Sequence, residues 1–165
     1  MSKFAPLIIE EIVGQNSYNW RFDFDQSDLT ETTVTTAQTL QVWLPTRAGD
    51  KIESVALFLD ESFQNTADTA YNDTQIEVGD SGDLDNFIVA IQANKNGTLG
   101  VFPAENTGDA LPYAIPATPL EIEVTILSMS GKSLVNLNKG RAHVLFKIFR
   151  KTKAAGLPAT GGENG

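Results

Sequence analysis

The stretch from Leu120 to Ser128 constrains the fold of this chain more than any other segment. Its apolar residues Ile122, Val124 and Ile126 alternate with polar residues. A period of two places successive side chains on opposite faces of a β-strand. The segment therefore predicts a strand in a sheet that has one buried face and one solvated face.

A second alternation lies near the N-terminus, where aromatic side chains share one face. Tyr18, Trp20, Phe22 and Phe24 occupy every second position, with polar residues between them. We expect this aromatic face to be part of the core. Six further segments are enriched in β-branched or aromatic residues and are predicted as strands: Leu7–Val13, Thr32–Leu44, Ile52–Asp60, Thr74–Val78, Thr98–Phe102 and Ala142–Arg150.

Turn chemistry separates these eight strands and leaves little of the chain for helices. Glycine, asparagine and proline cluster between them, as at Asn94–Gly97 and at Pro112, Pro116 and Pro119. Only Asp83–Gln92 is compatible with a short helix. Many short strands with at most one short helix predict an all-β chain that folds as a β-sandwich, jelly-roll-like in its strand count.

The chain is long enough for one domain and ends in a segment of different composition. It has 165 residues, of which 41% are hydrophobic, so a real core can form. We expect a single sandwich domain over residues 1–150, including an N-terminal docking segment. The final stretch KTKAAGLPATGGENG is small and polar and cannot bury enough surface to order alone. Residues 151–165 are therefore predicted to form a flexible C-terminal arm.

Net charge and local hydrophobicity argue against several classes of partner. With 12 basic and 21 acidic residues the formal charge is −9, so the surface repels nucleic acid and anionic lipid. The apolar run before Glu10 is too short for a signal peptide or a membrane span. We expect no nucleic-acid partner, no membrane partner and synthesis in the cytoplasm.

The residues predict no catalytic site, no cofactor and no metal. The chain has no cysteine, and His143 is its only histidine, which excludes a multi-histidine metal site within one chain. Asp80, Asp83 and Asp85 do not fit an EF-hand loop, so a turn followed by a helix N-cap is the favoured interpretation over a calcium site. A hydrolase with a carboxylate pair stays open because acidic residues are abundant. The favoured prediction is that the chain is not an enzyme.

Two terminal regions are predicted to make protein contacts. Half of the basic residues lie in an acid-free stretch near the C-terminus: Lys139, Arg141, Lys147, Arg150, Lys151 and Lys153. This stretch favours docking through charge complementarity, and an edge strand protected against unwanted pairing explains it equally well. The contact residues that we select from it are Lys147, Arg150, Lys151 and Lys153. The apolar segment FAPLIIEEIV either docks likewise or is the first core strand, and from it we select Phe4, Leu7 and Ile8.

Three segments resemble small structural proteins of tailed bacteriophages. They are TTVTTAQTLQVWLPTRAGDKIESVALFLDES, TQIEVGDSGDLDNFIVAIQ and SLVNLNKGRAHVLFKI. The VGDSGD turn before a short amphipathic run and the LxxLxxG turn before the last strand carry the resemblance. Proteins of this kind are often capsid decoration or cement proteins, which are β-sandwich modules bound between capsomers. The resemblance transfers no catalytic residue.

The resemblance implies a non-enzymatic virion structural protein that binds the outside of a phage capsid and cements neighbouring subunits. The expected partners are the major capsid protein and further copies of the chain, in a dimer or trimer, and the expected location is the capsid surface. Several copies of one interface would hold more strongly than any single contact. The alternative is a carbohydrate-binding or host-adhesion module of a phage particle, with Trp43, Tyr71 and Tyr113 as candidate exposed aromatic residues.

Overall fold

A computed structural model describes residues 7–11, 17–44, 46–94, 96–104, 111, 113–114, 120–129 and 131–150. These residues form ten strands and two short 3-10 helices, η1 (Gln26–Asp28) and η2 (Leu134–Asn136). The strands are β1 (Leu7–Glu11), β2 (Ser17–Asp25), β3 (Gln38–Trp43), β4 (Lys51–Gln64), β5 (Gln75–Asp80), β6 (Asp83–Gln92), β7 (Gly100–Pro103), β8 (Tyr113–Ala114), β9 (Glu121–Leu127) and β10 (Lys139–Phe149). Within this part of the chain no helix is long and apolar enough to cross a membrane.

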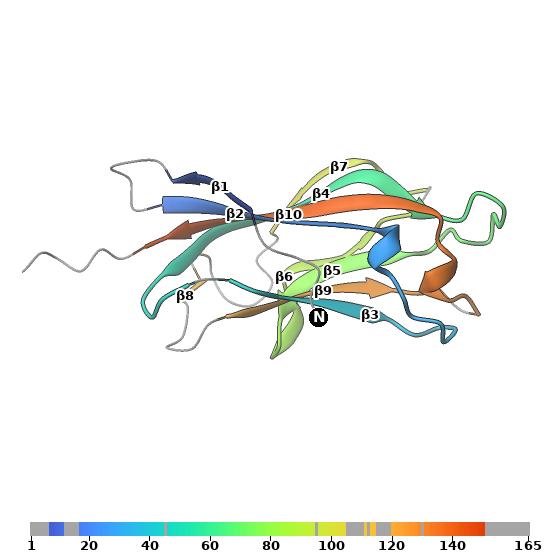
Figure 1. Cartoon of the computed structure of the whole chain (residues 1–165), viewed down its shortest axis with the longest axis horizontal. Coiled ribbons are helices and arrows are strands. Elements are labelled where there is room, and N and C mark those ends of the chain that lie inside the picture. The colour runs from blue at the N-terminus through green and yellow to red at the C-terminus, as the bar shows by residue number, and fades with distance from the viewer. Residues whose placement is uncertain are drawn as a thin grey trace, which may run out of the picture.

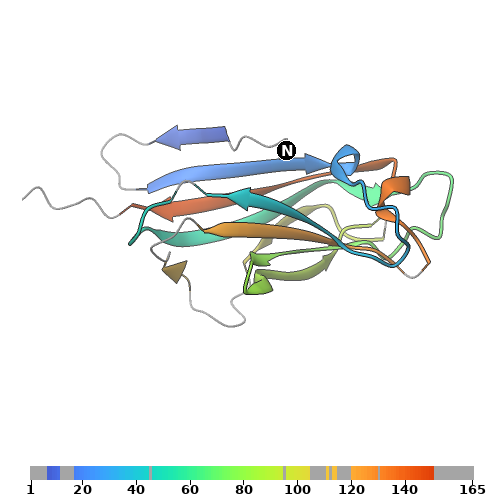
Figure 2. The same cartoon turned by 60° about the horizontal axis from the view of Figure 1, so that its bottom comes forward.

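The strands form two antiparallel sheets that pack face to face (Figure 1). The large sheet has six strands in the order β1-β2-β10-β4-β7, with β8 also paired to β4. The small sheet has four strands in the order β3-β9-β5-β6. Figure 2 shows β1 as the outermost strand of the large sheet, beside β2. The predicted all-β sandwich is confirmed.

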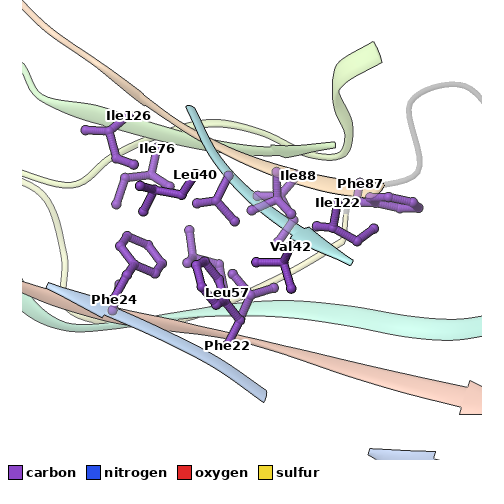
Figure 3. Packing of buried hydrophobic residues seen from close by; sticks show 14 of the residues in the cluster. Phe22, Phe24, Leu40, Val42, Leu57, Ile76, Phe87, Ile88, Ile122 and Ile126 are labelled. Atoms are coloured by element: carbon purple, nitrogen blue, oxygen red, sulfur yellow. The ribbon is translucent and has the colours of Figure 1, made fainter. Parts of the chain in front are cut away.

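The core lies between the two sheets and contains the faces that the alternating patterns predict. Phe22 and Phe24 of β2 project from the large sheet toward Val42 and Ile122 of the small sheet (Figure 3). Phe22 and Phe24 are each 2% exposed, and Ile122 is fully buried. Phe24 also stacks on Phe63 of β4, with ring centroids 5.9 Å apart. Aromatic side chains therefore fill much of the space between the sheets.

The segment Asp83–Gln92, the one stretch compatible with a short helix, is strand β6. β6 pairs with β5, but the register shifts between Ile76 and Val78 and again between Val78 and Asp80. Such shifts change which side chains face inward. Two consecutive residues of β6, Phe87 and Ile88, are consequently both buried.

Strand β3 begins at Gln38, six residues later than the predicted start at Thr32. The Gln38 side chain binds the preceding loop, because its Oε1 accepts hydrogen bonds from the backbone N–H groups of Thr30 (2.7 Å) and Glu31 (2.9 Å). Its Nε2 donates to the carbonyl of Asp28 (2.8 Å). The Gln38 side chain thus satisfies backbone hydrogen-bonding groups of the loop, so this segment does not need to pair with another strand.

Candidate functional site

Lys147 and Arg150 lie on or directly after β10, which the structure places inside the large sheet. β10 pairs with β2 on one side and with β4 on the other. Both of its edges are therefore hydrogen-bonded, and the expectation that this basic stretch forms or protects an edge strand is wrong. The charge pattern of one strand does not reveal which strands pair with it.

Both basic side chains make ion pairs within the chain. Lys147 Nζ lies 3.3 Å from Glu53 Oε2, and the Lys147 side chain is 53% exposed. Arg150 Nε lies 3.4 Å from Oδ2 of Asp50, whose side chain is buried. Arg150 Nη2 also donates to the Tyr18 hydroxyl (3.0 Å), and the guanidinium lies 4.6 Å from the centre of the Tyr18 ring. Arg150 thus compensates a buried carboxylate, while Lys147 is accessible to a partner.

The remaining predicted contact residues are in terminal regions. Phe4, Lys151 and Lys153, and with them the predicted arm 151–165, lie outside the described residues. Leu7 and Ile8 belong to β1, where Leu7 pairs with Arg21 and Ile8 with Trp20 of β2. In the described part of the chain β1 has no second neighbour, so the N-terminal segment follows one edge of the large sheet. The contact role of these residues stays a prediction.

The opposite edge of the sandwich is apolar and open. β7 ends the large sheet and β6 ends the small sheet, and no described strand pairs with the outer side of either. Near this edge Leu99 is 52% exposed and Val101 is 55% exposed. Between the two strands lies an apolar pocket of about 110 Å³, which we call the β6–β7 pocket, lined by Ile88, Val89, Ile91, Phe102 and Pro103. Sequence reasoning did not identify this pocket.

The small sheet carries negative charge without compensation from its own strands. Its four strands contain no lysine, arginine or histidine, and their acidic residues are Glu77, Asp80, Asp83, Asp85, Glu121 and Glu123. Burial raises the pKa of Glu77, and the nearby charges of Asp85 and Asp83 raise it further. A hydrogen bond with Asp83 raises the pKa of the Asp85 carboxyl, with a further contribution from burial. This sheet therefore disfavours contact with anionic partners.

Asp80 builds the turn between β5 and β6. Its Oδ1 accepts hydrogen bonds from the N–H groups of Gly82 (2.8 Å) and Asp83 (3.1 Å), and its Oδ2 accepts one from Asn86 Nδ2 (2.9 Å). The predicted turn is confirmed, whereas the helix N-cap is wrong because a strand follows. Among the described residues no group of three or more histidine, aspartate and glutamate side chains is arranged to hold a metal ion.

The three aromatic residues selected for possible sugar contact have different environments. Trp43 lies at the end of β3, opposite Glu121, and is 58% exposed. Tyr71 is buried at 3% exposure, and its hydroxyl donates a hydrogen bond to the carbonyl of Ser133 (3.0 Å). The expected exposure of Tyr71 is therefore wrong. The structure does not describe the Tyr113 side chain, so its exposure stays a prediction.

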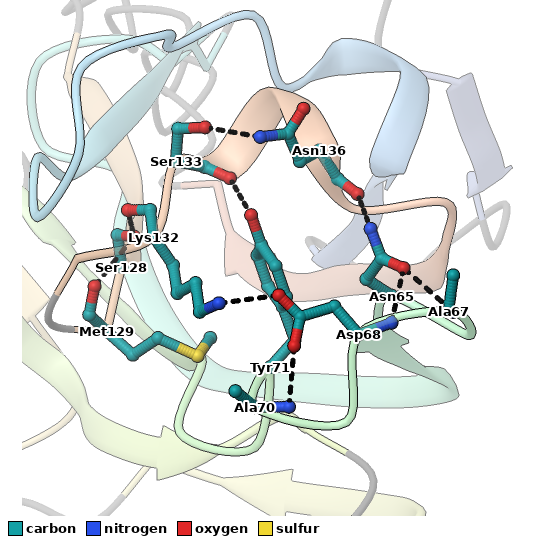
Figure 4. A network of polar contacts seen from close by, with 10 residues as sticks. All are labelled: Asn65, Ala67, Asp68, Ala70, Tyr71, Ser128, Met129, Lys132, Ser133 and Asn136. Carbon is teal, nitrogen blue, oxygen red and sulfur yellow. Dashed lines mark hydrogen bonds and ion pairs between the residues drawn. The ribbon is translucent and has the colours of Figure 1, made fainter.

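The loop between β4 and β5 is tied to the connection between β9 and β10 (Figure 4). Asn65 Nδ2 donates to the carbonyl of Asn136 (2.6 Å), and Asn65 Oδ1 accepts from the N–H of Asp68 (3.0 Å). Lys132 Nζ lies 2.5 Å from Asp68 Oδ2 and 5.3 Å from the centre of the Tyr71 ring. These contacts fix the relative positions of two loops at one end of the sandwich.

The loop between β2 and β3 joins the same assembly. The N–H of Thr35 donates to the carbonyl of Lys132 (2.9 Å), and the N–H of Gly131 donates to Thr35 Oγ1 (2.9 Å). Thr35 has φ of 60°, an unfavourable conformation for a β-branched residue that the surrounding contacts maintain. Val34 (55% exposed) and Val135 (42% exposed) are thus presented on a pre-organised loop surface.

His143 lies on the outer face of the large sheet, in strand β10 as expected. Its ring stacks on Phe58, with centroids 4.5 Å apart and planes inclined by 8°. Its Nδ1 lies 2.8 Å from Asp60 Oδ2. The contacts hold the imidazole flat against the neighbouring strand and give it a structural role.

No family model and no curated protein matches the chain. Among solved structures it is similar to a chain described as "Cyanophage Pam1 capsid asymmetric unit", with a TM-score of 0.59 and 18% sequence identity. The match covers 92% of this chain and 96% of that chain. The two chains share one fold over almost their whole length, and the resemblance to phage virion proteins is confirmed at the level of the fold.

Proposed function

We propose that this chain is a non-enzymatic structural protein of a phage virion that binds the outside of the capsid and cements neighbouring subunits. The observation that carries the proposal is the sandwich shared with a chain of a cyanophage capsid, which spans 92% of this chain. A shared fold does not by itself assign a function, so the surfaces must also suit the role. They do, because the features that stand out are contact surfaces.

The strand order supports a capsid-associated fold. If β1 and β8 are left out, the eight remaining strands can be numbered 1 to 8 along the chain. Their spatial order is then 1-8-3-6 in the large sheet and 2-7-4-5 in the small sheet. The first and last strands are then neighbours, and the chain crosses repeatedly between the sheets. We assign this order to a jelly roll, an architecture that viral capsid domains use widely.

Three surfaces suit docking, in keeping with this role. The β6–β7 edge offers apolar area, the fixed loop end presents Val34 and Val135, and Lys147 offers an accessible positive charge. The partners in this proposal are the major capsid protein and other copies of the chain. The protein would act on the virion surface after synthesis in the host cytoplasm, and the role requires no cofactor.

The proposal is tested with particles assembled from the major capsid protein of the same genome. The capsid protein is expressed with and without this chain, and the particles are purified on a gradient and heated. We expect the chain to be recovered with the particles in a fixed ratio and to raise the temperature at which they disrupt. Particles that exclude the chain, or that disrupt at the same temperature with it, would refute the proposal.

The alternative, a carbohydrate-binding or adhesion module, is favoured by one observation. Trp43 exposes 58% of its surface on the outer face of the small sheet, and exposed aromatic rings are suited to stacking on sugars. A glycan array with the unmodified chain and with Trp43→Ala tests it. Binding that the substitution abolishes would support the module, and an array without signal would remove it.

A further inference from the structure

We propose that the β6–β7 pocket receives the Phe4 side chain of a second copy of this chain. The inference rests on the proposed function because it names how neighbouring copies would associate on a particle. Three observations carry it: the chemistry of the pocket, the position of β1, and the length of chain that precedes β1.

The pocket matches one large apolar side chain in size and chemistry. Its volume is about 110 Å³, and its lining residues are apolar: Ile88, Val89, Ile91, Phe102 and Pro103. For comparison, an engineered apolar cavity of about 150 Å³ binds benzene. A partly open pocket of this size therefore suits an aromatic ring whose backbone stays outside.

Apolar side chains near the pocket are exposed in the described part of the chain. Leu99 and Val101, just before and within β7, are 52% and 55% exposed, while Phe102 packs partly against the core. Two sheet edges end here with no further described strand. Edges that expose apolar side chains are surfaces on which another chain can pair or pack.

The N-terminal segment of the same chain supplies a suitable group. Phe4 is followed by Ala5 and Pro6, and a proline disfavours helical backbone at the residue before it. The segment is apolar, with Lys3 as its one charged side chain before Glu10. An extended peptide that carries one aromatic anchor can place that ring in a pocket at a sheet edge.

The strand order disfavours docking of Phe4 into the pocket of its own chain. β1 and β7 are the two ends of the large sheet, separated by four strand-to-strand steps, which amount to about 19 Å. Phe4 precedes the first residue of β1 by three positions, so its Cα lies within about 11 Å of that of Leu7. We therefore assign the ring to a neighbouring copy. Reciprocal exchange of the segments gives a dimer, and cyclic exchange gives a ring such as a trimer.

A disulfide trap tests the contact directly, because the chain has no cysteine of its own. Full-length chains carrying Phe4→Cys and Val89→Cys are prepared separately with different masses, mixed and oxidised. We expect a mixed disulfide dimer in this pair and at least tenfold less in a control pair of Phe4→Cys with Ala48→Cys. Ala48 is a suitable control because it is an exposed residue of the loop between β3 and β4 and belongs neither to the pocket nor to the other docking surfaces.

Sedimentation equilibrium of disulfide-free chains gives the second measurement. Phe4→Ala should weaken self-association by about tenfold or more, as expected for loss of a buried aromatic contact, whereas Ala48→Ser should leave it unchanged. Circular dichroism checks that each variant is folded. A monomeric unmodified chain, equal trapping in both pairs, or a disulfide confined to single chains of a Phe4→Cys/Val89→Cys double variant would overturn the inference. Because no capsid is present, these outcomes are independent of the particle assay.

Discussion

A glycine near the start of β10 tests how tightly the large sheet is coupled to the core. Gly140 has φ of +142°, and a Cβ atom added there would lie 2.3 Å from Cδ1 and 2.8 Å from Cα of Phe63. Phe63 is fully buried and stacks on Phe24. Because the clash involves backbone as well as ring, rotation of the ring cannot remove it. Gly140→Ala should therefore destabilise the protein strongly.

Gly100 provides a control that separates two contributions to this loss. Its φ of +146° is almost the same, but nothing lies within 4 Å of an added Cβ atom. Gly100→Ala then adds only backbone strain, about 1–3 kcal/mol. Gly140→Ala adds the same strain and the cost of overpacking, for a total of about 2–6 kcal/mol. The difference between the variants measures the steric contribution alone.

Urea unfolding followed by tryptophan fluorescence measures both free energies. Trp20 is 6% exposed in the folded chain and becomes solvated on unfolding, so it reports the transition. Equal m-values would show that the variants unfold from equally compact states. Destabilisation of Gly140→Ala and Gly100→Ala by the same amount, within about 0.5 kcal/mol, would refute the reasoning, because it would show that β10 moves away from Phe63 without cost.

Four further substitutions test the polar contacts and a partly buried charge. Arg150→Gln should lower the free energy of unfolding by about 2–3 kcal/mol, since it leaves the buried Asp50 without its cation. Lys147→Gln removes an exposed ion pair and should lower it by less than about 1 kcal/mol. Urea unfolding at pH 7 compares the two variants. Tyr71→Phe should cost about 1 kcal/mol by removing the hydrogen bond to Ser133, and faster amide exchange in the loops of Figure 4 should accompany it. Glu77→Gln should stabilise by about 0.5 kcal/mol or less at pH 7, because the raised pKa means that the ionised carboxylate is disfavoured in the folded state. That gain should disappear as the pH falls below the ordinary pKa of 4.5, and unfolding at pH 7 and in acid shows whether it does.

Alternating patterns predict the inward faces of the sheets well and the outward faces less well. Ile122, Val124 and Ile126 of β9 are all fully buried, as the period of two requires. On the other face, however, Thr125 is only 2% exposed and hydrogen-bonds to Thr39 at 3.0 Å. β9 lies between β3 and β5, so neighbouring side chains cover its outer face as well. A strand's own sequence does not contain this information.

The apolar pattern that makes Asp83–Gln92 compatible with a helix belongs to an irregular strand. Its apolar residues Leu84, Phe87, Ile88 and Ile91 have the spacing of one face of a helix. In the structure the register shifts against β5 accompany burial of the consecutive residues Phe87 and Ile88, while Leu84 is 41% exposed. A bulge adds a residue to one strand and so changes the side-chain period locally from two toward that of a helix. Sequence periodicity alone cannot distinguish the two cases over ten residues.

Contact surfaces depend on which strands are at the edges, and edges follow from pairing between distant segments. The basic residues near the C-terminus suggested an edge, yet hydrogen bonds to β2 and β4 enclose β10. The β6–β7 pocket arises because Ile88 and Phe102, each in a segment that looks like ordinary core, belong to different sheets. One signal in the sequence was available: the predicted strand Thr98–Phe102 is short and contains a glycine, and short strands are a common form of sheet edge. Val101 leaves this edge apolar. Protection against unwanted pairing must therefore come from the shortness of β7 or from a partner that covers the edge. The disulfide trap distinguishes these two explanations.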